Sequence, residues 1–93
     1  LPMFYSLAQA SLVLKRYVVA VDAATTFIAR SEDEKFIAPA LIILAKGWLG
    51  IPDLDNAAEA LDNAETFADA AQKAEISKMR DMIDKVKKKE TGN

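Results

Sequence analysis

Apolar residues recur at steps of three and four along most of the chain, which is the spacing that places side chains on one face of an α-helix. Over residues 1–30 this stripe consists of Phe4, Leu7, Ala8, Leu14, Val18 and Val21. Between Pro2 and Arg30 there is no helix breaker. The local pattern therefore favours one long helix over this segment.

Residues 38–70 predict two helices joined by a tight turn. Pro39 suits the first turn of a helix that begins near Ala38, and Gly50 suits its end. Asp53 follows in the turn and is a candidate N-cap for a second helix, Leu54–Ala70. In that helix the block Leu-Asp-Asn-Ala occurs twice, so apolar residues share one face and acidic residues cover the rest.

A last helix is expected over about residues 74–88. Its apolar stripe consists of Ile76, Met79, Met82 or Ile83, and Val86. A lysine-rich run at residues 85–89 lies near its C-terminal end, where cations interact favourably with the helix dipole. Further upstream, Ser31 and Glu34 have the spacing of a capping box, which predicts the start of a helix there.

The chain also resembles itself at an offset of 37 residues. The identical pairs are Pro2 and Pro39, Leu7 and Leu44, Ala8 and Ala45, Leu12 and Leu49, Ala20 and Ala57, and Ala23 and Ala60. Offsets of this size are typical of stacked supersecondary units. The match favours a break near Lys15-Arg16, because its counterpart Pro52-Asp53 is a turn. Whether residues 2–30 form one helix or two stays open at this point.

In the second unit, small and bulky apolar residues alternate along two consecutive predicted helices: Leu41, Ala45, Trp48, Leu54, Ala57, Leu61 and Ala64. This pattern resembles a tetratricopeptide (TPR) repeat, a pair of antiparallel helices of about 34 residues. In the first unit the matching residues are Ala8, Tyr17, Ala20 and Ala24. Ser11 stands in place of the usual aromatic residue, and Lys15 in place of the usual turn glycine.

This resemblance implies an all-α fold in a single domain of residues 1–93. Two antiparallel helical hairpins, residues 1–30 and 38–72, are followed by a C-terminal capping helix at residues 74–89. The composition agrees with a helical domain, because 52% of the 93 residues are hydrophobic and only three glycines and three prolines occur.

The composition also excludes several kinds of chemistry. The chain has no cysteine and no histidine, which rules out disulfides, thiol nucleophiles, imidazole bases and Cys/His zinc sites. The segment that begins at Asp53 resembles the start of a calcium loop, but Ala58 and Ala64 occupy the positions of the required glycine and glutamate. No phosphate loop or nucleophile elbow occurs. We therefore expect no enzyme, no metal site and no cofactor.

Charge and hydropathy limit the classes of partner. A net charge of −2 gives no reason to expect nucleic-acid binding. The apolar stretches Met3–Leu14 and Phe36–Ile51 are both too short for a membrane-spanning helix. We expect a cytoplasmic protein, with peripheral membrane contact through Met3–Leu14 as the weaker alternative.

In the resembling family the first helix of each hairpin lines a concave groove that holds a peptide. Carried over by position, the partner-binding residues are Tyr5, Gln9, Leu12, Ile42, Lys46 and Leu49. Lys46 is the one cation among them, so the resemblance implies a scaffold or adaptor for an apolar or amphipathic partner segment, such as a helix, rather than an acidic tail. The alternative is a structural subunit that homo-oligomerises, or joins a stable complex, through its nearly uncharged N-terminal helix.

Overall fold

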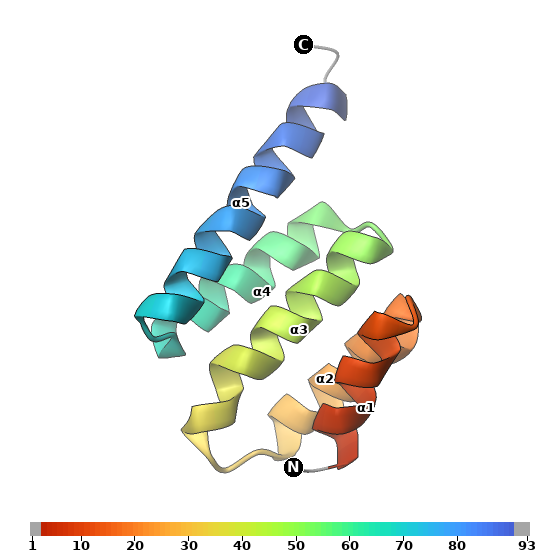
Figure 1. The fold of residues 1–93 in the computed structure, drawn as a ribbon, viewed down its shortest axis with the longest axis vertical. Coiled ribbons are helices and arrows are strands. Elements are labelled where there is room, and N and C mark those ends of the chain that lie inside the picture. The colour runs from red at the N-terminus through yellow and green to blue at the C-terminus, as the bar shows by residue number, and fades with distance from the viewer. Residues whose placement is uncertain (1–2, 91–93) are drawn as a thin grey trace.

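The computed structural model describes residues 3–90, and within this range the chain forms five α-helices and one short 3-10 helix (Figure 1). Their bounds are α1 Met3–Val13, α2 Tyr17–Arg30, η1 Glu34–Phe36, α3 Ile37–Gly50, α4 Leu54–Phe67 and α5 Ala70–Glu90. Consecutive α-helices pack antiparallel, so the predicted all-α fold of successive hairpins is confirmed. Pro2, which pairs with Pro39 in the offset match, lies outside the described residues.

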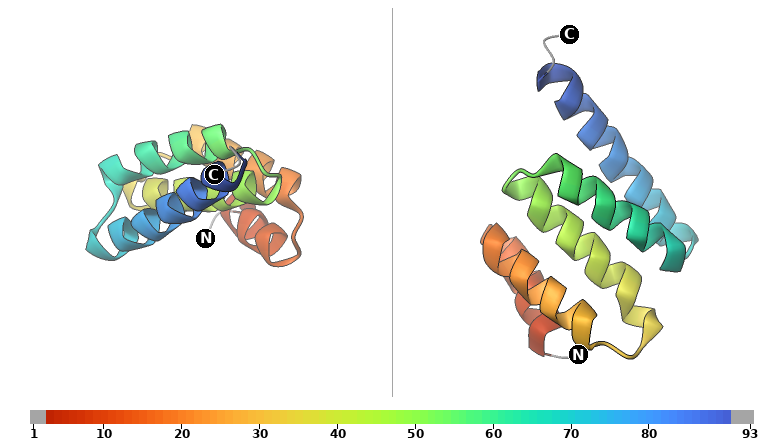
Figure 2. Two further views of the ribbon diagram at one scale, coloured as in Figure 1. Left: turned by 90° about the horizontal axis from the view of Figure 1, so that it is seen from above. Right: turned by 180° about the vertical axis from the view of Figure 1, so that it is seen from behind.

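The helices lie on two sides of a central helix, α3. Seen from above, α1 and α5 lie on one side of the molecule and α2 and α4 on the other, with α3 between them (Figure 2). α3 contacts each of the other four α-helices. Side chains of α1, α3 and α5 therefore meet on one face, although they come from distant parts of the sequence.

Residues 3–30 form two helices, which answers the question that the local pattern left open. α1 ends at Val13 and α2 begins at Tyr17, with a short turn between them. The backbone of Lys15 has φ 59°, in the left-handed region. Arg16 N–H donates to the Ser11 carbonyl at 2.8 Å and closes the turn. Lys15 thus adopts a backbone conformation that glycine reaches without steric cost.

Small residues occupy the places where helices approach most closely. The alanines that are at most 1% exposed are Ala8, Ala20, Ala24, Ala38, Ala40, Ala45, Ala57 and Ala64. A Cβ atom on Gly47 would stand 2.8 Å from Val21 Cγ2, and one on Gly50 would overlap the ring of Tyr17. The lack of side chains on these two glycines lets α2 lie directly on α3.

Two apolar clusters form the core. The larger one joins α3, α4 and α5 and includes Leu41, Leu61, Ile76 and Ile83. The smaller one lies between α1, α2 and α3 and is built on three aromatic rings. Tyr5 meets Phe27 and Phe36 edge to face at centroid distances of 5.3 and 6.0 Å. This geometry fixes the start of α1 against the end of α2 and the 3-10 helix.

The expected capping box at Ser31 is wrong. The side chain of Asp33 accepts a hydrogen bond from Lys35 N–H at 3.0 Å and caps η1, while the Ser31 hydroxyl bonds within the preceding turn. A reciprocal pair occurs instead at the start of α5. Gln72 N–H donates to Asp69 Oδ1 at 2.8 Å, and Asp69 N–H donates to Gln72 Oε1 at 2.9 Å. This pair explains why α5 begins at Ala70, before the predicted start at residue 74.

The predicted apolar stripes are only partly buried. Leu7, Leu14 and Val18 are 44%, 64% and 63% exposed, respectively. In α5 the buried alternative is Ile83, and Met82 is 55% exposed. The apolar stripe does not show which of its residues are buried, because α1 and α2 each bury only the sides that pack against neighbouring helices.

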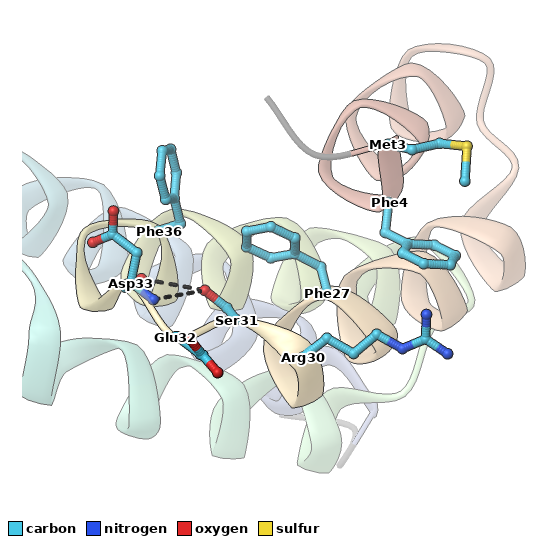
Figure 3. Close-up of a pocket in the computed structure, with 8 residues that line it drawn as sticks. All are labelled: Met3, Phe4, Phe27, Arg30, Ser31, Glu32, Asp33 and Phe36. Carbon is cyan, nitrogen blue, oxygen red and sulfur yellow. Dashed lines mark hydrogen bonds between the residues drawn. The ribbon is translucent and has the colours of Figure 1, made fainter.

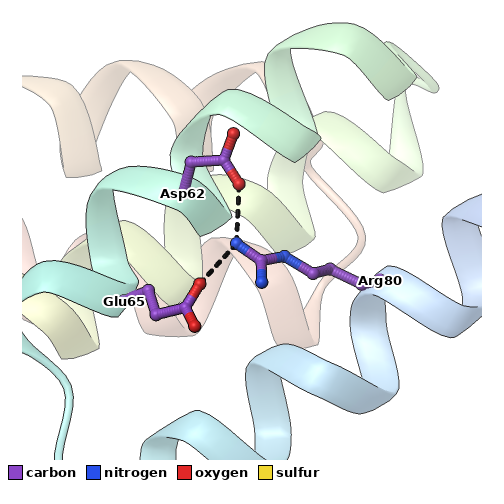
Figure 4. A network of polar contacts seen from close by, with 3 residues as sticks. All are labelled: Asp62, Glu65 and Arg80. Atoms are coloured by element: carbon purple, nitrogen blue, oxygen red, sulfur yellow. Dashed lines mark hydrogen bonds and ion pairs between the residues drawn. The ribbon is translucent and has the colours of Figure 1, made fainter.

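Ion pairs on the surface hold α5 against α4. Arg80 donates to Asp62 and to Glu65, each at 2.6 Å (Figure 4). Nearer the C-terminus, Lys87 pairs with Asp55 at 3.3 Å. Burial of Arg80 lowers its pKa, but the bonds and charges of Glu65 and Asp62 outweigh this effect, so the net pKa is raised. These exposed pairs fix the register of α5 more than they stabilise the fold.

No helix within residues 3–90 combines the length and the apolar character that crossing a membrane requires.

Candidate functional site

Side chains from α1, α3 and α5 surround a hollow of about 190 Å³. Its lining residues are Tyr5, Gln9, Pro39, Ile42, Ile43, Lys46, Gln72 and Glu75. Four of the six residues predicted to bind a partner are among them: Tyr5, Gln9, Ile42 and Lys46. The structure therefore brings most of the predicted site together, on the face where the first, third and fifth helices meet.

A second hollow of about 710 Å³ adjoins the first between α1 and α3. Its lining residues are Ser6, Gln9, Ala10, Leu12, Val13, Ile43 and Lys46. The two hollows share Gln9, Ile43 and Lys46, and together we call them the groove. Leu12, the fifth predicted residue, lines the second hollow.

Leu49 lines neither hollow. It is half-buried and packs against the larger apolar cluster, one turn beyond Lys46 on α3. Tyr5 and Ile42 are buried at 8% and 4% exposure, so they form the base of the groove. Gln9 and Lys46 are exposed.

An ion pair crosses the groove. Lys46 Nζ on α3 lies 2.8 Å from Glu75 Oε2 on α5, with both side chains 44% exposed. The charge of Lys46 is therefore balanced within the protein. Sequence reasoning missed Glu75 and its neighbour Gln72, because no local signal shows which turn of α5 would lie beside α3.

The phenol of Tyr5 stays neutral at physiological pH. Burial raises the pKa of Tyr5 above its ordinary value of about 10, and the nearby charge on Lys46 opposes part of this rise. Lys46 and Glu75 are therefore the charged groups that line the smaller hollow, and they neutralise each other. The rest of its lining is apolar, amide or neutral phenol.

Another cavity, which sequence reasoning did not find, lies where α1 begins and α2 ends (Figure 3). It has a volume of about 540 Å³, and its apolar walls are Met3, Phe4, Phe27 and Phe36. The Arg30 guanidinium lies 5.3 Å from the ring centroid of Phe4 in a cation–π contact. Glu32 and Asp33 also line this cavity, so its walls carry charges of both signs. The cavity therefore favours neither an anionic nor a cationic ligand.

Among the side chains that the structure describes, no three Asp or Glu residues lie close enough together to hold a metal ion. Comparison with protein-family models gave no match, and comparisons with curated proteins and with solved structures gave none either.

Proposed function

We propose that the protein is a non-enzymatic interaction module built from TPR-like hairpins, and that its groove binds an apolar or amphipathic segment of a partner protein. α1 with α2 and α3 with α4 are the two hairpins, and α5 is the capping helix. The observation that carries the proposal is the groove itself, because side chains from three helices distant in sequence line it. Five of its lining residues were predicted from position alone.

The burial of the small residues supports the TPR-like interpretation. Ala45, Ala57 and Ala64, which carry the resemblance in the second unit, are all completely buried. In the first unit Ala8 and Ala20 are at most 1% exposed. Alanine at such positions lets neighbouring helices touch, which is what stacked hairpins require.

The chemistry of the groove supports an amphipathic ligand. Its cation, Lys46, is already paired with Glu75, so little charge is left to hold an acidic tail. Leu12 and Val13 offer aliphatic surface, and Gln9 offers an amide that can donate and accept hydrogen bonds. A helix with one apolar face fits such a lining.

Selection of peptides from a displayed library of helical sequences tests this function. We expect the selected peptides to carry apolar residues at helical spacing and to compete with one another for one site. In NMR titrations, amide shifts should change around Gln9, Leu12 and Lys46. Changes confined to Thr25 and Glu59, which line a hollow on the α2 and α4 side, would contradict the proposal.

A second candidate function is self-association through the outer side of the first hairpin. The exposed apolar residues there are Met3, Leu7, Leu14, Val18 and Val19, which are 41–74% exposed. Large apolar side chains exposed in such number are typical of interfaces. Sedimentation at low micromolar concentration separates the two functions. A dimer that persists in high salt supports self-association, and a monomer throughout that range rules it out.

A further inference from the structure

Beyond the Lys46–Glu75 pair, α5 carries an apolar row on the same helix face as Glu75. Glu75, Met79, Met82 and Val86 follow one another at steps of four, three and four, so they share one face of α5. The bond from Glu75 to Lys46 shows that this face is turned to the groove. Met79 is buried, but Met82 and Val86 are 55% and 39% exposed. An apolar shelf therefore extends the α5 wall.

This shelf lies level with the end of α3. Lys87, next to Val86, pairs with Asp55 in the first turn of α4, which follows directly on the α3–α4 turn. Met82 lies one helical turn before Val86. The groove is thus polar where Gln72 and Glu75 line it, and apolar where Leu12 and Val13 line it at the C-terminal end of α1.

Lysines stand along the outer edge of the shelf. Lys78, Lys85 and Lys89 follow at steps of seven and four, which places them beside the row of Met82 and Val86 and away from α4. All three are exposed. Neither Lys78 nor Lys85 pairs with an acidic side chain that the structure describes.

The opposite wall is uncharged. On α1 it presents Ser6, Gln9 and Val13. On α5, Asp84 lies on the far side of the helix, and Asp81 lies behind the lysine row. A segment bound in the groove would therefore meet the uncharged side chains of α1 on one flank and the lysine row on the other.

We propose that the partner segment is an amphipathic helix with an apolar face and an acidic flank, bound with its acidic flank beside Lys78, Lys85 and Lys89. This inference rests on the proposed function of the groove. The apolar face would cover Leu12, Val13 and Met82, and the acidic residues would complement the lysine row.

The shape of the site favours a helix over a lipid surface. Leu12 is half-buried and Ile42 is buried at the base of hollows between helices, where a flat bilayer does not reach. A helix with its side chains is a rod of about 10–12 Å in diameter and presents apolar residues along one line. Nucleic acid would leave the apolar shelf uncovered.

The probes are three labelled helical peptides of about five turns, with the same leucine face and with Glu, Gln or Lys along one flank. We expect affinity to fall in the order Glu, Gln, Lys, and the affinity of the Glu peptide to fall further with salt. In Lys78→Glu/Lys85→Glu the Glu peptide should bind about tenfold more weakly, and the Lys peptide should bind more tightly than it does to the unchanged protein.

The matched control is Lys35→Glu/Lys73→Glu, which changes the net charge equally at exposed positions away from the groove. It should bind the Glu peptide like the unchanged protein. Circular dichroism checks that both variants keep their helices. Equal losses in the two variants would mean that only total charge matters, which overturns the inference.

The outcomes separate this inference from the function on which it rests. If all three peptides bind equally well, and Val13→Asp weakens all of them, the groove binds helices but the acidic flank is wrong. If no peptide binds, but phosphatidylserine vesicles bind and Lys78→Glu/Lys85→Glu releases them, the surface is a membrane contact and both proposals fail. If neither peptides nor vesicles bind, the inference also fails.

Discussion

Replacing Leu61 with alanine should lower the free energy of unfolding by about 3 kcal/mol. Leu61 lies in α4, is completely buried, and belongs to the cluster that joins α3, α4 and α5. Removing its three outer carbon atoms loses their transfer free energy and leaves a cavity. The surrounding alanines cannot fill this cavity because their side chains are too short to move into it.

The loss is large for a domain of this size. Small domains have a total stability of about 5–15 kcal/mol, and each kcal/mol shifts Tm by roughly 4–8 °C. Thermal and urea unfolding of Leu61→Ala should therefore show a Tm lower by about 12–24 °C. Leu7→Ala is the matched control, since the same atoms are removed from a side chain that is 44% exposed. Equal losses in the two variants would contradict the described core.

The second hairpin was predictable because its signals are local. Pro39 lies in the first turn of α3, and Gly50 is the last residue of that helix. Asp53 accepts a hydrogen bond from Asn56 N–H at 3.1 Å, so its expected role as an N-cap is confirmed. Each of these residues affects backbone groups no more than three or four positions away. Such local effects can be predicted from the sequence alone.

The break between α1 and α2 was harder to predict. Nothing in the side chain of Lys15 favours its left-handed backbone, and the apolar period continues across the turn. The offset match indicated the break because it compares distant parts of the chain.

The predicted cap at Ser31 was wrong for a different reason. Asp33 lies close by and competes for the same backbone donors.

The groove was predictable from α1 and α3 but not from α5. Tyr5, Gln9 and Ile42 follow from their positions in the two hairpins. Whether Glu75 reaches the groove depends on where α5 begins. The hydrogen bonds between Asp69 and Gln72 set that start, which is earlier than expected. The place of the lysine row depends on the ion pair between Glu75 and Lys46, because this long-range contact sets which face of α5 is turned to the groove.

The second large effect concerns binding. Val13→Asp should weaken the binding of a library-selected peptide about thirtyfold, which corresponds to roughly 2 kcal/mol. Val13 is 81% exposed and lines the larger hollow, so an aspartate there is tolerated in the free protein. When a peptide covers it, the carboxylate loses its hydration without gaining a partner.

Val18→Asp is the matched control. It introduces the same change in the same hairpin at a valine that is 63% exposed and lines neither hollow of the groove. Circular dichroism and thermal unfolding show whether each variant remains folded. Both variants thus introduce the same charge in place of the same residue type at exposed positions. They differ in the side of the hairpin that carries the aspartate.

The ratio of the peptide dissociation constants of Val13→Asp and Val18→Asp, measured by fluorescence anisotropy, tests most directly whether the groove is the binding surface. We predict a ratio of about thirty, with Val18→Asp binding like the unchanged protein. A ratio near one, or weaker binding by Val18→Asp than by Val13→Asp, would contradict a binding site between α1, α3 and α5.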